Sequence, residues 1–308
     1  MAQYHGQMVM ISARFFKRKN YNMIRYNELI SNIQQYKKVM VAFSGGIDSY
    51  FVLKASIDAL GSENVLAVTA DSPSLKQSEK DITVKLAGSV GANHKIIFTD
   101  ELSNPNYYNN PNNRCFFCKD EMYSKLDEMK NDLEYKFVLD GTNFDDMNDY
   151  RPGFKASKNH GIKSPLADLK FTKNEIREIS KELGLEIWNK PASPCLSSRI
   201  PYGQQVTTEK LEMIEKAEDM LKALGFKEYR VRHIEVNGDE NLQNTKMKLA
   251  KLEISKDEMD KALNKEIFSF IDENLKQLGY DFVTLDMAGL DPERSRSVNI
   301  KLPVSSKP

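Results

Sequence analysis

Cysteine is scarce in this 308-residue sequence, which contains only three, and long apolar runs are absent. Three cysteines do not make a paired disulfide framework, so we expect metal or thiol chemistry in a reducing compartment. Near the start, residues 8–11 are apolar, but no run approaches the ~20 residues that a membrane-spanning helix needs. We therefore expect a cytoplasmic protein with no membrane partner.

An excess of charge is also missing, because Lys+Arg and Asp+Glu both number 44. A balanced chain has no general attraction for nucleic acid or for an anionic membrane surface. This balance favours a small substrate over RNA.

Hydrophobic patterning divides the chain into three parts. Residues 1–24 lack a clear period and are expected to be a loosely ordered extension, with helical spacing starting near residue 27. Between 25 and 203, short apolar strands alternate with helices, which predicts an α/β fold with a parallel sheet and helices on both faces. Residues 204–308 show an αββαβ order, which predicts a small α+β domain for substrate binding or oligomerisation.

The most informative stretch is 39–50, where an apolar strand stops at Ser44-Gly45-Gly46 and a helix pattern begins. Backbone N–H groups at such a helix start have no partner and favour an anion. The two glycines allow the main chain to approach a phosphate closely. No Gly-Lys-Ser/Thr ending follows, so the turn is not a Walker loop.

Other polar residues follow strands of the same predicted sheet. Asp71-Ser72 ends the second strand, and Asp140-Gly141-Thr142-Asn143 ends a later one. Ligands of parallel sheets bind at the carboxyl ends of the strands, so these residues are expected to share one edge with the glycine turn.

The cysteines form a Cys-x-x-Cys pair, Cys115 and Cys118, and a distant third, Cys195. Soft thiolates suit an iron–sulfur cluster or zinc. A zinc site would need a fourth ligand, and the four histidines show no recognisable spacing for one. A simple redox pair is a further alternative.

Ser-Gly-Gly-x-Asp-Ser at 44–49 resembles the PP-loop of ATP pyrophosphatases, which split ATP between the α- and β-phosphates. Together with residues 68–72, 140–153 and 188–203, it resembles the LarE-type sulfur transferases of nickel-pincer nucleotide biosynthesis. The resemblance covers about residues 25 to 300. It implies that the enzyme adenylates the carboxylates of a pyridinium biscarboxylate mononucleotide, releases pyrophosphate, and replaces oxygen with sulfur.

The same resemblance implies ATP and Mg²⁺ as cofactors and assigns the site. Asp48, Ser49 and Cys195 are expected to be catalytic, and Asp146 and Asp149 to hold magnesium. The residues expected to bind nucleotide or substrate phosphate are Ser44, Gly45, Gly46, Asp48, Ser49, Ala70, Asp71, Ser72, Gly141, Asn143, Arg151, Lys163, Arg199, Arg230, Arg232, Arg294 and Arg296.

For sulfur, the resemblance implies two routes. Three-cysteine members hold a 4Fe–4S cluster, here through Cys115, Cys118 and Cys195, whose open iron binds sulfide. Members with a lone cysteine at the Cys195 position give up its sulfur and retain dehydroalanine. Sulfide or another donor is therefore an expected partner.

In the second domain, Arg230 and Arg232 alternate along a predicted strand and therefore share a face, where guanidinium groups could bind the substrate phosphate. Arg294 and Arg296 could join them. We also expect a homo-oligomer. The alternatives are a tRNA thiolase, an amide-forming ligase related to NAD synthetase, and a non-enzymatic iron–sulfur or nucleotide sensor.

Overall fold

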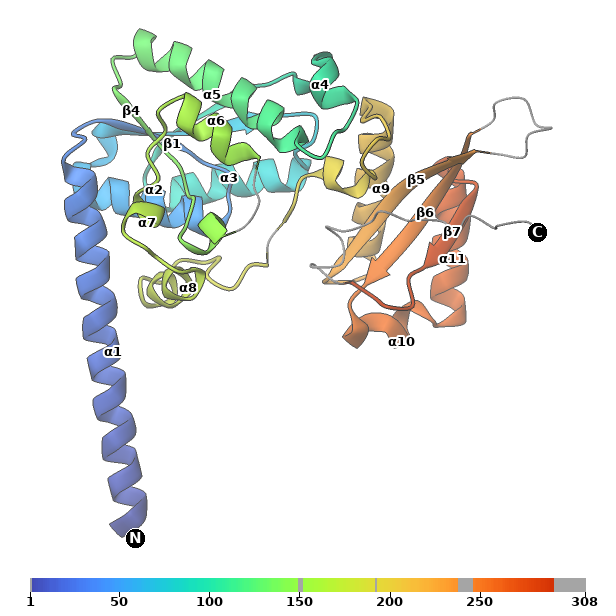
Figure 1. Ribbon diagram of the computed structural model, residues 1–308. Helices are drawn as coiled ribbons and strands as arrows, with labels where there is room; N and C mark the ends of the chain where they lie inside the picture. Colours follow the sequence, from blue (N-terminus) through green and yellow to red (C-terminus); the bar gives the residue numbers. More distant parts are fainter. Residues whose placement is uncertain (1, 149–151, 192, 238–245, 291–308) are drawn as a thin grey trace, which may run out of the picture. The chain divides into compact units, whose positions relative to one another are not determined.

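The computed structural model describes residues 2–148, 152–191, 193–237 and 246–290 (Figure 1). The chain forms two compact units. The first contains the chain up to Tyr107 and then Asn113–Pro194, and the second contains Tyr108–Asn112 and the chain from Cys195 onward. No helix in the described ranges combines the length and hydropathy needed to cross a bilayer.

Helices and strands alternate through the first unit. Up to residue 194 the chain forms α1 (Ala2–Gln34), β1 (Val39–Ala42), α2 (Ile47–Leu60), η1 (Ser62–Asn64), β2 (Val65–Asp71), α3 (Gln77–Ser89), β3 (Asn93–Phe98), η2 (Glu101–Ser103), α4 (Pro105–Tyr108), α5 (Arg114–Asp132), β4 (Phe137–Leu139), η3 (Asp145–Asn148), α6 (Gly153–Asn159), α7 (Pro165–Asp168) and α8 (Lys173–Glu182). It continues as η4 (Leu196–Arg199), α9 (Thr208–Ala223), β5 (Tyr229–Asn237), β6 (Lys246–Ile254), η5 (Lys256–Glu258), α10 (Met259–Ala262), α11 (Lys265–Gln277) and β7 (Phe282–Leu285).

The sheet of the first unit has the order β3-β2-β1-β4, and all its pairs are parallel. β1 is central between β2 and β4, with Val39 opposite Val65 on one side and Phe137 on the other. The α/β fold expected from the alternation is confirmed. Because the strands run the same way, the segments after β1, β2 and β4 meet at one edge.

Helices cover both faces of this sheet. Val39 and Val41 of β1 pack into a core with α1, α2, α7 and α8, whereas Met40 packs into a second core with α5 and α6. Successive side chains of a strand point to opposite faces, so this short buried strand contributes to both cores. It is thereby held firmly just before the glycine turn.

The N-terminal segment differs from the expectation. Residues 2–34 form the single helix α1, where we expected a loosely ordered extension before a helix near residue 27. Its last part is fixed by burial: Tyr26, Leu29 and Ile33 lie in the core, and Tyr26 donates a hydrogen bond to Asp58 (2.8 Å). Helix geometry continues outward from this docked portion.

The second unit is built on a three-stranded sheet of order β5-β6-β7, with β5 and β6 antiparallel and β6 and β7 parallel. Residues from α9 and α11 pack into its apolar core. The small α+β domain was expected from residue 204, but this unit begins at Cys195. The reason is that the turn at Leu196–Arg199 hydrogen-bonds to α9 and β5, as described below.

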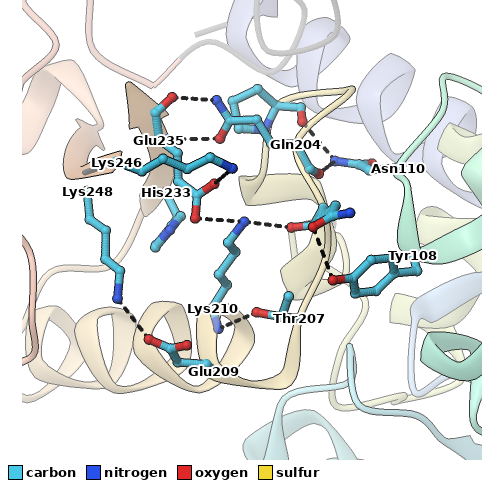
Figure 2. Close-up of polar contacts among 12 residues, drawn as sticks. Tyr108, Asn110, Gln204, Thr207, Glu209, Lys210, His233, Glu235, Lys246 and Lys248 are labelled. Carbon is cyan, nitrogen blue, oxygen red and sulfur yellow. Dashed lines mark hydrogen bonds and ion pairs between the residues drawn. The ribbon is translucent and has the colours of Figure 1, made fainter. Parts of the chain in front are cut away.

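A short insert, Tyr108–Asn112, also belongs to the second unit. Fully buried Asn110 adopts a positive φ of 54° and donates its side-chain amide to the carbonyls of Pro201 (2.8 Å) and Gln204 (2.9 Å). Figure 2 shows Asn110 and Tyr108 beside this segment, with Tyr108 donating to Gln205. The segment just before the Cys-x-x-Cys pair is therefore tied to this unit by hydrogen bonds.

Candidate active site

The turn after β1 is shaped by two serines. The Ser49 hydroxyl donates to the Gly46 carbonyl (3.0 Å) and accepts from the Ser44 backbone N–H (3.2 Å), and it lies 3.1 Å from the Ser44 hydroxyl. Ser49 is buried. Its hydroxyl therefore holds the loop closed, which is a positioning contribution, and the N-terminus of α2 is left to face a ligand.

Glycine is required at two places around this loop. Gly45 has φ +73°, and a Cβ there would lie 2.9 Å from Thr83 Cγ2. Gly141, just after β4, packs so closely that a Cβ would lie 2.5 Å from the backbone nitrogen of Ser49. The two expected nucleotide-binding segments, 44–49 and 140–143, are thus in direct contact.

Asp48 is the charged group of the loop. Its Oδ2 forms an ion pair with Lys173, the first residue of α8, while its Oδ1 is buried and has no hydrogen-bond partner among the described residues. Burial raises the pKa of Asp48, the Lys173 ammonium acts in the opposite direction, and the Asp146 carboxylate adds to the increase. A buried, incompletely satisfied carboxylate is suited to receiving a cation.

Asp146 is a second carboxylate suited to a cation near Asp48. Its Oδ2 accepts from the Asn143 backbone N–H (3.1 Å), and the Asn143 side chain accepts from the Asp146 N–H (3.1 Å). The described residues contain no group of three or more His, Cys, Asp or Glu arranged for a metal. Mg²⁺ commonly takes only one or two carboxylates together with substrate phosphates, so Asp48 and Asp146 fit that ion. Asp149 lies outside the described residues.

The end of β2 lies beside the loop, because β1 and β2 are neighbours. Ala70 and Asp71 are its last residues, and Asp71 forms an ion pair with Lys80 of α3 (3.0 Å). The Ser72 hydroxyl accepts from the Ser74 backbone N–H (3.1 Å). The structure thus brings the expected nucleoside-binding residues to the same sheet edge.

Lys163 lies alongside β4. Its N–H donates to the Val138 carbonyl, and its carbonyl accepts from the Asp140 N–H, both at 2.9 Å. Asp140 in turn accepts from Ser164 (2.7 Å) and Thr142 (2.9 Å). Lys163 therefore belongs to the edge where the site lies, whereas Arg151 is outside the described residues.

The thiols occupy two different settings. Cys115 and Cys118 lie in the first turns of α5, three residues apart and so on one helix face. Cys195 is exposed at the start of η4 in the second unit. None of the three forms a disulfide. The donor set is soft enough for iron or zinc, but no trio of donors is gathered among the described residues.

Three arginines surround the Cys195 turn within the second unit. Arg230 and Arg232 share one face of β5 as expected, and burial together with the neighbouring Arg199 and Arg232 charges lowers the pKa of Arg230. Arg232 pairs with Glu253 (3.0 Å), and its Nη2 is buried without a partner among the described residues. This buried Nη2 of Arg232 is a donor that suits an anion. Arg294 and Arg296 lie outside the described residues.

Sequence reasoning missed the charged partners of the candidate site residues. Lys173 follows Thr172, whose capping box with Glu175 was visible in the sequence, but nothing in the pattern pairs it with Asp48. Lys80 and Glu218 were missed for the same reason. Each is an ordinary charged residue on a helix until the fold supplies its partner.

Comparison with known proteins identifies relatives of this chain. Residues 23–106 match the family model described as NAD synthase. The chain is 37% identical over 262 residues to the pyridinium-3,5-bisthiocarboxylic acid mononucleotide synthase of Lactiplantibacillus plantarum, covering 85% of this chain and 90% of that protein. It is 39% identical over 264 residues to the uncharacterized protein slr1717 of Synechocystis, covering 84% of this chain and 94% of that protein.

A more distant relative is the glutamine-hydrolysing GMP synthase of Bdellovibrio bacteriovorus, 27% identical over 209 residues, which are 59% of this chain and 40% of that protein. The match to the GMP synthase therefore covers little more than half of this chain, whereas the match to the bisthiocarboxylic acid mononucleotide synthase covers 85% of it. With its glycine turn, Asp48 and the Cys195 turn in place, the chain belongs to the LarE-type family of PP-loop, ATP-using sulfur transferases.

Proposed function

We propose that the protein converts pyridinium-3,5-biscarboxylic acid mononucleotide into its bis-thiocarboxylic form, with one ATP used for each carboxylate. The observation that carries the proposal is the 37% identity, across 85% of the chain, to a synthase of that product. The helix N-terminus behind Gly45 and Gly46 supports it, because this loop suits phosphate.

Activation comes first, since a carboxylate is a poor electrophile. Its oxygen attacks the α-phosphorus of ATP, an O–P bond forms, and the bond to pyrophosphate breaks. We propose that the loop N–H groups and Lys173, which pairs with Asp48, neutralise phosphate charge; at an effective dielectric near 20, a cation about 4 Å away contributes roughly 4 kcal/mol. We propose that Asp48 and Asp146 hold Mg²⁺, which would supply further neutralisation.

Sulfur insertion follows. Sulfur attacks the acyl carbon, a C–S bond forms, and the C–O bond to AMP breaks. We propose that Cys195 serves this step and that the phosphate of the substrate binds near Arg230 and Arg232, whose guanidinium groups suit it. Asp71 and Ser72 would lie near the nucleoside of ATP.

The source of sulfur is a separate proposal. Cys115, Cys118 and Cys195 would hold a 4Fe–4S cluster, which when bound offers an open iron for sulfide. Support comes from the thiolate chemistry and from the shared helix face of Cys115 and Cys118. It does not come from a group of three metal donors, since none is found among the described residues. Anaerobically purified protein should then be brown, and Cys115→Ala should lose both colour and repeated turnover.

The competing route is donation of the Cys195 sulfur itself. The intact mass of the chain would then fall by H₂S after a single reaction. Several products per chain with an unchanged mass contradict that route, whereas a colourless and fully active protein contradicts the cluster.

The function is tested by supplying ATP, Mg²⁺, sulfide and the biscarboxylate mononucleotide, and following pyrophosphate and product mass together. We expect pyrophosphate only with the mononucleotide present, and product in which sulfur replaces oxygen. Replacing sulfide by ammonium tests the amide-forming alternative. An amide product, or pyrophosphate release with tRNA instead, contradicts the proposal.

We also propose that the protein is a homo-oligomer. Support comes from large apolar side chains exposed on the second unit, namely Phe268 and Phe270 of α11, Phe282 of β7 and Met287. Light scattering of the purified chain measures this directly, and a monomer at micromolar concentration contradicts it.

A further inference from the structure

The turn that carries Cys195 is almost entirely buried except at the cysteine. Leu196, Ser197 and Arg199 are at most 3% exposed, whereas Cys195 is exposed at the N-terminal end of η4. The Ser198 N–H donates to the Cys195 carbonyl (3.0 Å), which closes the turn. The thiol is thus presented by a backbone that has little freedom.

Arg199 holds this backbone from within. Its Nη1 donates to the Cys195 carbonyl (3.3 Å) and to the Ser198 hydroxyl (2.9 Å), while its Nε and Nη2 donate to the two carboxylate oxygens of Glu218 at 2.8 and 3.1 Å. At least four of the five guanidinium N–H donors are therefore used within the chain.

Glu218 is fully buried and accepts a further hydrogen bond. One of its oxygens also accepts from the Val231 backbone N–H (3.0 Å), so the Arg199–Glu218 pair connects the turn to α9 and β5. Arg232 adds a further restraint, because its Nη1 donates to the Ser198 carbonyl (2.6 Å). Two arginines from different elements thus donate to two carbonyls of one turn, those of Cys195 and Ser198.

A buried ion pair contributes little net stability, but it fixes geometry when its hydrogen bonds are complete. The donors of Arg199 are directed at this turn rather than at a ligand. We propose that Arg199, held by Glu218, is a positioning residue that sets the direction of the Cys195 thiol for sulfur insertion, and not an anion ligand. The inference rests on the proposed role of Cys195.

A positioning residue for Cys195 affects sulfur insertion, whereas an anion ligand affects substrate binding and adenylation. Arg199→Lys keeps the charge but removes the planar fork, and Glu218→Gln removes its partner. In a single turnover we expect the rate of pyrophosphate release to stay near the wild-type value. In steady state we expect the same of the KM for the mononucleotide. Thiocarboxylate formation should fall at least about tenfold, because small misplacements of a reacting group are costly.

Glu235→Gln is the matched control. Glu235 lies on β5, like Arg232, and pairs with Lys210 of α9 (2.9 Å) and with Lys246 (Figure 2). It should leave both half-reactions unchanged. If Arg199→Lys instead raises the KM and abolishes pyrophosphate release, Arg199 is an anion ligand; if both half-reactions are unaffected, it has no role.

A second measurement separates positioning from general unfolding and from the proposed function. In the full chain with Cys115→Ser and Cys118→Ser, Cys195 is the sole thiol, and its alkylation rate is read by intact mass. Adding Arg199→Lys should raise that rate severalfold, with an unchanged far-UV spectrum. An unchanged rate overturns the inference even if sulfur insertion is demonstrated; failure of wild-type sulfur insertion leaves the alkylation result standing.

Discussion

Two glycines determine how closely the backbone packs around the PP-loop. Gly45 needs a positive φ, and Gly141 leaves no space for a Cβ beside Ser49 and Asp48. Glycine is usually discussed as a flexible residue, but at Gly141 it matters because it is small. The phosphate site therefore depends on a residue that touches the loop from another strand.

Gly141→Ala should displace the loop, because its Cβ would lie 2.5 Å from the Ser49 nitrogen and 2.8 Å from the Asp48 carbonyl carbon. We expect a loss of about 1–3 kcal/mol in unfolding free energy and a large loss of pyrophosphate release, both measurable on the purified variant. Gly88→Ala in α3 is the control, since a Cβ there meets nothing within 4 Å. Equal activity of the two variants contradicts the packing argument.

Lys173→Ala removes the cation that pairs with Asp48. A charge aligned with phosphate would be lost and a carboxylate left without its partner, so kcat/KM for ATP should fall about a hundredfold. Lys173→Arg should recover part of the loss. Lys85→Ala, which breaks the exposed Lys85–Glu186 pair on the same unit, should change little. Steady-state kinetics with varied ATP measure all three, and a wild-type value for Lys173→Ala excludes the role.

At the scale of elements, β5 serves two purposes through its two faces. Arg230 and Arg232 point to one face, near the Cys195 turn, while Val231 and His233 are fully buried on the other. Strand alternation thus separates a face with two arginines, which we propose binds the substrate phosphate, from a structural core within one strand. Substitutions at neighbouring positions should consequently have different kinds of effect.

His233 makes the stability of the second unit depend on pH. Burial lowers the pKa of His233 to about 4; Lys210 and Lys248 act in the same direction, and Glu209 and Glu235 oppose them. Its Nδ1 lies 3.3 Å from the Tyr280 hydroxyl. Below pH ~6.5 the unfolded chain binds a proton that the folded chain does not.

Stability should therefore fall as pH drops from about 6.5 to about 4, by up to ~3 kcal/mol for this one group, and change no further through it below pH 4. Denaturant unfolding at several pH values, comparing wild type with His233→Gln, measures the difference. The variant should be less stable at neutral pH but lose less on acidification. Parallel pH profiles would assign the acid sensitivity to other groups.

For the whole molecule, separate hydrophobic cores predict separate unfolding units. Leu53 lies in the core of the first unit and Leu221 in that of the second, and neither is exposed. Leu53→Ala and Leu221→Ala should each cost about 2–5 kcal/mol. We expect calorimetry to show that each variant shifts a different part of the transition. One transition shifted alike by both variants would indicate a single cooperative unit.

Local signals predicted much of this architecture. The helix pattern expected after the glycine turn is α2, because periodicity and glycine turns act over a few residues. The end of the first unit was less predictable. Its position depends on Arg199 reaching Glu218 and Arg232 reaching Ser198, contacts that no local pattern reveals.

The sequence by itself determined the phosphate-binding turn, the α/β class and the presence of three thiols, since each is expressed by neighbouring residues. Only the tertiary structure decided which charged side chains pair with each other. Lys173 lies 125 positions from Asp48, yet the two form an ion pair, and Arg199 donates to the Cys195 carbonyl and to Glu218. A charged side chain can pair with any opposite charge, and folding alone selects which one it meets.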